Sequence, residues 1–396
     1  MLKTNVRGAQ NNHSDVCLGD IVERHVERCV DPISSGYDVF VGVDDMDPDD
    51  LHLRRVNKIE VNSLPPTFRF VFRKGMVLFP TRRPALRKCA LAHRDGITGE
   101  KVLVLKSRNH DLLLPEFAPF LLASERVRHW SIERAIGSVT PHFRWGDLSR
   151  LSVRVPPTDM QRDAMPALYA LDNTREAWRD ALGSASLLRR ALLSSTFRGE
   201  PGRKLVPLRD ALACILSGGT PSRANGEFWR GSIPWLSPKD MKTSLLHETT
   251  EHVSDAGAAG GTTIAPSDTL FVVVRGMILA HTFPVCRAAQ PMAFNQDIKG
   301  LVFRSEIDPK FAQAWLEWLA PQCLQMVSET SHGTKRLETD RLLALQFPMV
   351  SSSQQQALVR RLGLVDAAID GIRERIARCT ALEKQFVSQV LAEAQP

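Results

Sequence analysis

The sequence has no long apolar run, no paired cysteines and no signal-peptide pattern. No run approaches the roughly 18 apolar residues that a membrane span needs, and the amino-terminal stretch has no apolar core. The seven cysteines are scattered singly without CxxC spacing, which argues against a disulfide framework and against a zinc site. Single cysteines are typical of a reducing cytosol. We therefore expect a cytoplasmic protein without a bound metal.

Catalytic motifs are absent as well. The sequence contains no GxxxxGK[ST], GxGxxG, GxSxG, HExxH or kinase signature. The stretch Ser217-Gly-Gly-Thr-Pro-Ser222 lacks the lysine and the following helix of a phosphate loop. A glycine-rich S-adenosylmethionine loop is also missing, and the proline pairs after Leu64 and Val155 lack the leading Asn or Asp of an amino-methyltransferase. We predict that the chain performs no chemistry and binds no cofactor itself.

Composition describes a globular protein with room for more than one core. A chain of 396 residues exceeds one ordinary domain and suggests two or three. Hydrophobic residues make up 43% and charged residues 24%, which is enough apolar material for real cores. The formal net charge of +7 makes a polyanionic partner plausible without proving one.

Residues 351–395 predict one long helix. Apolar residues recur at alternating spacings of four and three, which keeps one seam on one side of the helix; they are Leu358, Leu362, Val365, Ile369, Ile372, Ile376 and Cys379. The pattern then slips in phase to Leu382, Phe386 and Val390. At about 1.5 Å per residue the helix would be roughly 60 Å long, too long for one element of a compact core. Such a helix needs a partner.

An internal repeat supplies that partner. Leu151–Pro156 matches Leu343–Pro348 at an offset of 192, and each is followed by a polar segment that could start a helix. Asp45-Met46 and Asp240-Met241 also match, at an offset of 195. The first helix has its own apolar seam, at Leu168, Leu171, Trp178, Leu182, Ala185, Leu188 and Leu192. Two such helices can lie antiparallel and bury their seams on each other.

The repeat predicts the fold class. We expect a mixed α/β (α+β) protein with two similar globular domains, joined by two long antiparallel coiled-coil helices, as an internal duplication with pseudo-two-fold symmetry. The expected bounds are residues 1–156 for the first domain, 157–200 for the first helix, 201–350 for the second domain and 351–396 for the second helix. The stretch from Arg198 to Gly202 is the best linker in the chain.

Two corresponding stretches lack acidic residues. Between Glu60 and Asp95 the chain has eight basic residues and no acidic one, and the matching stretch from Asp268 to Asp297 is also free of acids inside. A solvated basic face explains either stretch alone, but the pair favours a surface that meets phosphates, where carboxylates would repel the DNA backbone. The candidate DNA-binding residues are Lys74, Arg82, Arg83, Arg87, Lys88, Lys239, Lys242, Arg275, His281, Lys335 and Arg336.

Several motifs resemble the DNA-specificity subunit of type I restriction–modification systems. They are Ser217-Gly-Gly-Thr-Pro-Ser222, Trp229-Arg-Gly-Ser-Ile-Pro-Trp235-Leu-Ser-Pro-Lys-Asp-Met-Lys242, Asn295-Gln-Asp-Ile298 and His332-Gly-Thr334. The resemblance is detailed over residues 205–396 and looser over 15–200. In the first unit Gly137-Ser-Val-Thr140 replaces the Gly-Thr loop, and Ile97-Thr-Gly-Glu100 stands where the second unit has Asn295–Ile298.

The resemblance implies a function that composition alone does not. Each globular unit would be a target-recognition domain that reads one half of a split, asymmetric site in double-stranded DNA. The helices would set the gap between the halves and dock two methyltransferase subunits. Those subunits would supply S-adenosylmethionine and adenine-N6 methylation, and separate motor–nuclease subunits would supply ATP- and Mg²⁺-dependent translocation and cleavage.

Two alternatives belong to other classes. A single-chain nuclease could use Asp240 and Lys242, although that three-residue pattern is common. A helical scaffold without DNA specificity would share the long helices but would leave the paired acid-free stretches unexplained.

Overall fold

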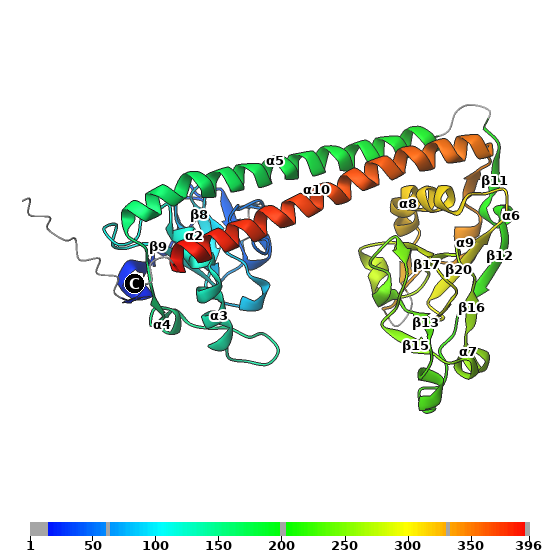
Figure 1. The fold of residues 1–396 in the computed structure, drawn as a ribbon, viewed down its shortest axis with the longest axis horizontal. Coiled ribbons are helices and arrows are strands. Elements are labelled where there is room, and N and C mark those ends of the chain that lie inside the picture. Colours follow the sequence, from blue (N-terminus) through cyan, green and yellow to red (C-terminus); the bar gives the residue numbers. More distant parts are fainter. Residues whose placement is uncertain (1–14, 61–63, 199–202, 330–332, 393–396) are drawn as a thin grey trace, which may run out of the picture. The chain divides into compact units, whose positions relative to one another are not determined.

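The computed structural model describes residues 15–60, 64–198, 203–329 and 333–392, which form two compact units (Figure 1). The first unit comprises Met1–Asp180 and Arg373–Pro396, and the second comprises Ala181–Ile372. Each of the two long helices therefore contributes one part to each unit. Among the described residues, no helix is both long and apolar enough to cross a bilayer.

The first unit is built on two four-stranded sheets. The strand order is β2-β9-β6-β7 in one sheet and β4-β3-β8-β5 in the other, where β3 and β8 run parallel and the remaining neighbours antiparallel. The strands are β2 (Val22–Arg24), β3 (Val39–Val41), β4 (Asn57–Lys58), β5 (Phe68–Phe72), β6 (Val77–Pro80), β7 (Ala90–Leu91), β8 (Gly96–Gly99) and β9 (Val102–Ser107). The other elements are β1 (Val16–Cys17), α1 (Leu18–Ile21), η1 (Val43–Asp45), η2 (Pro84–Leu86), α2 (Ala118–Ala123), α3 (Glu125–Glu133), α4 (Trp145–Leu148) and β10 (Ser152–Val153).

The second unit repeats this topology. Its sheets have the orders β12-β20-β17-β18-β14 and β15-β13-β19-β16, and β13 runs parallel to β19 as β3 does to β8. The strands are β11 (Leu205–Pro207), β12 (Leu212–Ser217), β13 (Ile233–Leu236), β14 (Leu245–Leu246), β15 (Glu251–Val253), β16 (Thr263–Ala265), β17 (Leu270–Val273), β18 (Val285–Ala288), β19 (Met292–Phe294), β20 (Ile298–Phe303), β21 (Ser328–Glu329), β22 (Lys335–Arg336) and β23 (Gln346–Pro348). The helices are α6 (Leu208–Ala211), η3 (Gly226–Trp229), η4 (Pro238–Asp240), α7 (Asp255–Gly261), η5 (Met277–Ala280), α8 (Pro309–Gln325) and α9 (Thr339–Leu343).

The matching strand orders confirm the internal duplication and correct its register. The backbone N–H of Leu18 donates to the carbonyl of Leu151, and in the second unit Leu208 donates to Leu345 in the same way. Leu151 therefore corresponds to Leu345, an offset of 194. The sequence alignment of Leu151 with Leu343 was two residues wrong, because both stretches have apolar residues at every second position and so match at shifts of two.

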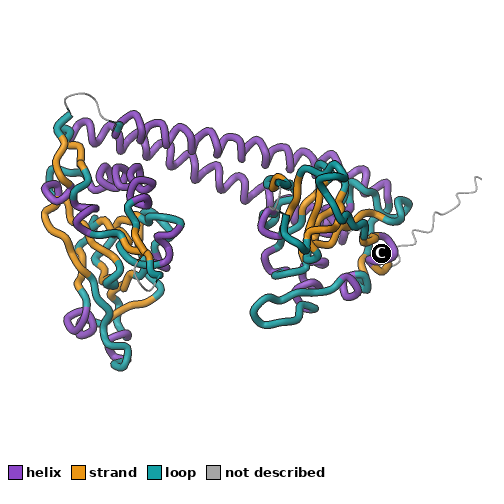
Figure 2. Tube along the Cα trace, turned by 180° about the vertical axis from the view of Figure 1, so that it is seen from behind, coloured by secondary structure: helices purple, strands orange, loops and turns teal. Residues whose placement is uncertain are grey.

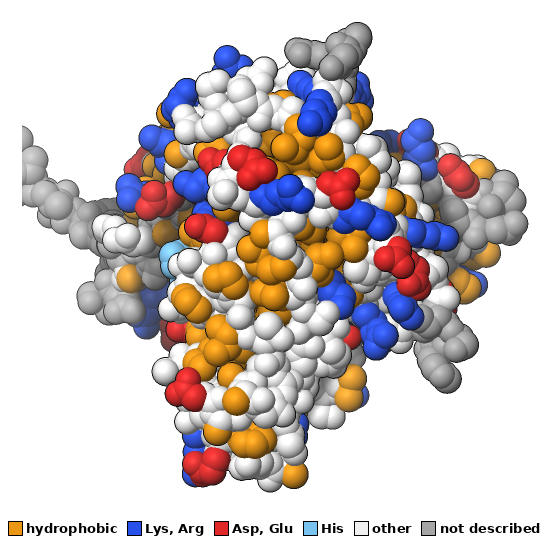
Figure 3. All heavy atoms as spheres, turned by 90° about the vertical axis from the view of Figure 1, so that its right-hand side faces the viewer, with side chains coloured by type: hydrophobic (Ala, Val, Ile, Leu, Met, Phe, Trp, Pro, Cys, Tyr) orange, Lys and Arg blue, Asp and Glu red, His pale blue; other side chains and the backbone are white. Residues whose placement is uncertain are grey.

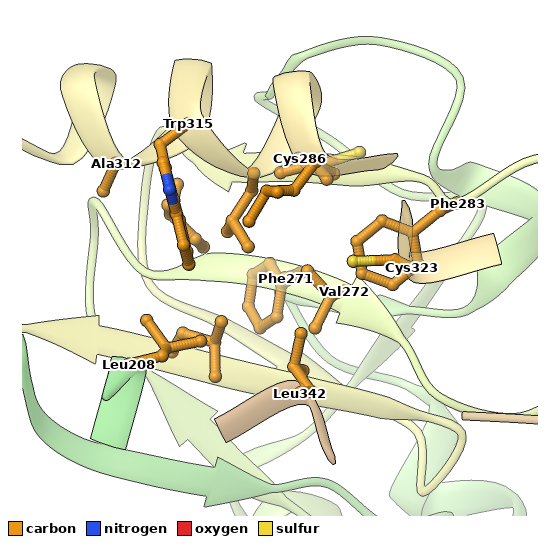
Figure 4. Close-up of a cluster of buried hydrophobic side chains, with 14 of the residues drawn as sticks. Leu208, Phe271, Val272, Phe283, Cys286, Ala312, Trp315, Cys323 and Leu342 are labelled. Atoms are coloured by element: carbon orange, nitrogen blue, oxygen red, sulfur yellow. The ribbon is translucent and has the colours of Figure 1, made fainter. Parts of the chain in front are cut away.

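The core of the second unit forms because its central strand is covered on both faces. All four residues of β17 are buried aliphatic or aromatic residues, as expected of an interior strand. Figure 4 shows Trp315 of α8 reaching toward the sheet that carries Phe271 and Val272. Trp315 also packs edge-to-face on Phe347 of β23, with ring centroids 4.9 Å apart. This packing attaches α8 to the strand that leads into the last long helix.

The two long helices lie side by side in both views (Figures 1 and 2). They are α5 (Thr158–Phe197) and α10 (Ser352–Ala392). In the first unit, the beginning of α5 and the end of α10 share a core that includes Leu168 and Val387. In the second unit, the end of α5 and the beginning of α10 share another core that includes Leu193 and Leu358. Within each unit the two helical segments are therefore antiparallel, as the sequence predicts.

A buried glutamine ties the first turn of each long helix to its globular unit. The side chain of Gln161 accepts a hydrogen bond from the Leu114 N–H (2.9 Å) and donates to the carbonyls of Leu112 and Pro156 (2.7 Å each). Gln355 makes the same three bonds 194 positions later. It accepts from the Asp308 N–H at 2.7 Å and donates to the carbonyls of Glu306 and Val350 at 3.0 and 3.1 Å. We call these two arrangements the glutamine clamps.

Candidate nucleic-acid interface

In the second unit, three predicted cations come together at the end of β17. The backbone N–H of Gly276 donates to the carbonyl of Lys335 at 2.9 Å, and Arg275 and Arg336 form an antiparallel β-bridge. These bonds hold the segment after β17 against β22, so that Arg275, Lys335 and Arg336 are neighbours although about 60 positions separate them in the sequence.

The Asn295–Ile298 motif joins the same surface. The carbonyl of Asp297 accepts hydrogen bonds from the N–H groups of Val274 and Arg275, at 2.8 and 3.3 Å. The hydroxyl of Thr220 donates to the side chain of Gln296 at 2.7 Å, which attaches the glycine-rich loop. Burial raises the pKa of Asp297 above its ordinary value, while the neighbouring charge of Arg275 opposes that rise. Two of the motifs that carry the family resemblance, Ser217–Ser222 and Asn295–Ile298, therefore meet at one place in the fold.

Acidic residues moderate the charge of this surface. Lys335 pairs with Glu329 at 2.5 Å, and Arg336 pairs with Glu338 at 3.2 Å. Arg275 is exposed. Figure 3 looks onto the face of the second unit that carries β11, β12 and β16, where charges of both signs are interspersed with hydrophobic side chains.

The backbone of the glycine-rich loop, Ser217–Ser222, packs closely against neighbouring segments. A Cβ atom at Gly218 would lie 2.2 Å from the carbonyl oxygen of Phe294, and one at Gly219 would lie 2.2 Å from the carbonyl oxygen of Gly261. Only glycine permits backbones to approach so closely. The prediction that this stretch is not a phosphate loop agrees with this packing role.

Sequence reasoning missed an arginine–tryptophan stack beside this loop. The guanidinium carbon of Arg223 lies 3.5 Å from the ring centroid of Trp229, and Glu251 accepts hydrogen bonds from both terminal nitrogens of Arg223 at 2.5 and 3.2 Å. The indole N–H of Trp235 donates to the carbonyl of Gly219 at 3.0 Å. The two tryptophans of the resemblance motif were the available signal, since tryptophan is the preferred ring for a cation.

Among the remaining predicted cations of the second unit, Lys239 shares its carboxylate partner with Arg223. Lys239 pairs with Glu251 at 3.1 Å, while Lys242 and His281 are exposed. Asp240, the carboxylate of the nuclease alternative, accepts hydrogen bonds from the N–H and hydroxyl groups of Ser237 and Thr250. Burial alone would raise the pKa of Asp240, but these hydrogen bonds outweigh burial and hold the pKa below its ordinary value.

The first unit places Arg82 where the second unit has Arg275. Arg82 forms a β-bridge with His142, and the N–H of Arg83 donates to the carbonyl of Pro141 at 2.7 Å. These contacts repeat those of Arg275 and Gly276 in the second unit. Both Arg82 and Arg83 are exposed. The duplication thus gives each unit an exposed arginine at the same position of its fold.

Two other predicted cations of the first unit, Arg87 and Lys88, have partners within that unit. The guanidinium of Arg87 bonds to Asp49 and to Glu125. The ammonium of Lys88 donates to the carbonyl of Val43 at 2.9 Å, and only about an eighth of its side chain is exposed. Lys74 is exposed.

Asp49 anchors the end of α10 to the first unit. It accepts hydrogen bonds from Arg87 and Arg128 and pairs with Lys384 of α10 at 2.9 Å. Burial would raise its pKa, but the hydrogen bonds from Arg128, Lys384 and Arg87 outweigh that effect and lower the pKa to about 2. Asp49 therefore remains ionised at any ordinary pH.

One group of residues in the first unit has the chemistry of a metal site. Ligand atoms of Asp50, His52 and Glu176 lie within 4.8 Å of one another. However, Arg54 pairs with both carboxylates at 2.5 Å, and Arg179 pairs with Asp50 at 3.0 Å. The guanidinium groups already neutralise these carboxylates, so the arrangement is a salt-bridge network between the first unit and α5 and not a site prepared for a cation.

The predicted seam residues divide into buried, half-buried and exposed. Leu168, Leu358, Leu362, Ile369 and Ile372 are buried, and Trp178, Leu182, Val365 and Ile376 are half-buried. The structure corrects the prediction at Leu188, whose side chain is 52% exposed, and also at Leu382, which is 53% exposed. Beyond Cys379, Val387 and Val390 are the buried residues of α10. The seam therefore continues past the phase slip through residues other than Leu382.

Both units have charged residues at one equivalent pair of positions on α5 and α10, but the charges differ between the units. In the second unit Arg189 of α5 pairs with Asp366 of α10 at 2.6 Å. The positions 194 residues away are Glu383 and Asp172, two acids, and the buried Arg175 bonds to both of them. Burial raises the pKa of Glu383, against the opposing charge of Arg175.

Comparisons with known proteins agree with this architecture. No family model matches the chain. The fold is that of type I specificity subunits: a solved chain of a type I restriction–modification system gives a TM-score of 0.58 at 19% identity, with 96% of both chains covered. The S subunit of a type I system from M. genitalium gives 0.51 at 13% identity, with 97% of both chains covered.

In sequence, the chain is 28% identical over 172 residues to a type I restriction enzyme specificity subunit of Escherichia coli. That match covers 43% of this chain and 43% of the relative, so it spans less than half of the relative's length. The resemblance suggested by the motifs is thereby confirmed, in fold over nearly the whole chain and in sequence over one segment. His332, which the resemblance also used, lies outside the described residues.

Proposed function

We propose that this chain is the DNA-specificity subunit of a type I restriction–modification complex, with each globular unit reading one half of a bipartite, asymmetric site. The observation that carries this proposal is the duplication itself. Two units of the same topology present exposed arginines, Arg82 and Arg275, at equivalent positions. Arginine side chains suit both phosphate contacts and bidentate contacts to guanine.

In this proposal α5 and α10 set the gap between the half-sites and dock two methyltransferase subunits. Support comes from Leu188 on α5 and Leu382 on α10, which are exposed to the same extent and lie 194 positions apart. A duplicated chain that exposes the same apolar side chain at both equivalent positions suits two copies of one partner.

Catalysis belongs to the partners in this proposal. The methyltransferase subunits carry S-adenosylmethionine and methylate adenine N6, and motor–nuclease subunits carry ATP and Mg²⁺. The complex works in the cytoplasm, where its DNA is. The hydrogen bonds that hold Asp240 as the cap of η4 give this carboxylate a structural role, which favours the proposal over a single-chain nuclease.

Co-expression with the cognate methyltransferase tests the function. Sequencing that detects methylated adenines in the host genome is expected to show one bipartite motif with a fixed gap. Omitting this chain is the control and is expected to abolish the motif. If the motif is absent with both proteins present, or is still methylated without this chain, the proposal fails.

Paired substitutions test the two surfaces separately. Arg82→Ala with Arg83→Ala, and Lys335→Ala with Arg336→Ala, are each expected to weaken DNA binding by the assembled complex. Each lost phosphate contact should also reduce the slope of log affinity against log salt by about 1. Arg341→Ala, which removes an exposed cation of α9, is the matched control. Unchanged affinity and slope in both double variants would favour the scaffold alternative.

A further inference from the structure

Val139 is an apolar side chain at the tip of a loop in the first unit, and 87% of it is exposed. Ile136, at the base of the same loop, and Ile132, near the end of α3, are also about half exposed. Folding leaves most of the Val139 side chain in water.

The loop is fixed in place by its backbone. Ile136 and His142 exchange two hydrogen bonds, of 2.8 and 3.0 Å, and the Pro141 carbonyl accepts from the N–H of Arg83 at 2.7 Å. Gly137 adopts a left-handed conformation, with φ of 100°, that starts the turn. Val139 is thereby presented on a loop bonded directly to the segment that carries the exposed Arg82 and Arg83.

The second unit carries different chemistry at the same place. The offset of 194 aligns Val139 with Gly333, and Pro141 and His142 with Lys335 and Arg336. The matching residues of the second unit are thus a glycine and two cations, whereas the first unit has a valine, a proline and a histidine there. Two domains of one topology that read different half-sites should differ in the residues that reach the bases.

An apolar side chain beside two exposed arginines has one apolar target on the base edges of DNA, the C5-methyl group of thymine in the major groove. We propose, resting on the function proposed above, that Val139 contacts the C5-methyl group of a thymine in the half-site read by the first unit. Arg82 and Arg83 hold the flanking phosphates in this arrangement. Val139 is then a specificity-determining residue of the first unit.

Deoxyuridine substitution tests the contact, because it removes the methyl group and keeps every hydrogen-bonding group. The duplex carries the mapped site, and each thymine of both half-sites is replaced in turn by deoxyuridine. Binding is measured with the full chain assembled with its methyltransferase subunits. One replacement in the first half-site is expected to weaken binding about fourfold, the value for burying one methyl-sized group.

The valine is then varied against a matched control. Val139→Ala is expected to bind the thymine duplex several-fold more weakly than wild type and to lose the difference between thymine and deoxyuridine at that position. Val30→Ala changes another valine of the first unit that is 87% exposed, and it should behave as wild type.

Three outcomes overturn the inference while the proposed function stands, provided that the wild-type complex binds its site specifically. They are no effect of deoxyuridine at any position of the first half-site, a first half-site without thymine in either strand, and a loss in Val139→Ala that is equal on thymine and deoxyuridine duplexes. An equal loss on both duplexes would indicate that Val139 contacts protein or inserts between base pairs, and not that it contacts the methyl group. Absence of specific binding by the wild type would instead refute the proposed function.

Discussion

Removing the side chain of Gln355 is expected to loosen the second unit without affecting the first. In Gln355→Ala the Asp308 N–H and the carbonyls of Glu306 and Val350 lose their side-chain partner. A hydrogen bond contributes about 1 kcal/mol net, so three of them contribute about 3 kcal/mol. These groups are only partly buried, so water can replace some of the loss, and about 3 kcal/mol is the upper end of the expected destabilisation.

Hydrogen exchange followed by mass spectrometry measures this effect locally. If the clamp is lost, the peptide containing Asp308 should exchange up to about 100-fold faster, since about 1.4 kcal/mol corresponds to a factor of ten. Gln356→Ala is the control, because Gln356 is exposed and its side chain makes one long hydrogen bond of 3.4 Å to Ser352. Gln161→Ala should accelerate exchange at Leu114 and leave Asp308 unchanged. If exchange at Asp308 is the same in Gln355→Ala and Gln356→Ala, the clamp does not hold α10 to its unit.

Three further predictions concern the helices. Ile372→Asp should destabilise the protein by several kcal/mol, because the carboxylate would be desolvated in the seam without a partner. Leu364→Asp is the control and should cost under about 0.5 kcal/mol, because the Leu364 side chain is 76% exposed. Equal midpoints of urea unfolding for the two variants would show that the seam is not buried. Asp49→Asn should destabilise the first unit by about 2 kcal/mol at neutral pH by unpairing Arg128. Because the pKa of Asp49 is lowered from 3.8 to about 2, its contribution is present above pH 3.8 and is lost as the pH falls through about 2, so the variant should lack that step in an acid titration followed by circular dichroism. Inserting four residues, about one turn, into both α5 and α10 should lengthen the recognised gap, and a change in either half-sequence in methylation sequencing would contradict the assigned roles.

The sequence predicted the long helices and the duplication because both leave a periodic trace. The spacing of Leu358 through Ile376 repeats over many turns, and no local alternative competes with it. The register of the repeat was wrong by two residues, since apolar residues stand at every second position after both Leu151 and Leu343 and match equally well when shifted by two. The hydrogen bond from Leu208 to Leu345, which resolves this, joins residues far apart in the chain.

Side-chain roles in the first unit could not be read from the sequence. The partners of Arg87, Asp49 and Glu125, each lie 38 positions away in the sequence, so no local spacing indicates these pairs. The apolar period also marked Leu188 and Leu382 as seam residues, but a period does not distinguish the buried edge of a stripe from its exposed edge. The extended backbone of Ser124 separates α2 from α3, and no glycine or proline marks that break in the sequence.

The equivalent positions Arg83 and Gly276 show how the duplication has diverged. Both residues follow the exposed arginine of their unit, and both donate a backbone hydrogen bond to the neighbouring loop. Both have positive φ, 50° for Arg83 and 132° for Gly276. Glycine adopts such a conformation freely, whereas a residue with a Cβ is strained there by about 1 kcal/mol. The first unit therefore retains a cation at some cost to its stability, beside a loop that has no lysine or arginine. In the proposed contact of Val139 with DNA, a need for positive charge beside this loop would account for that cost.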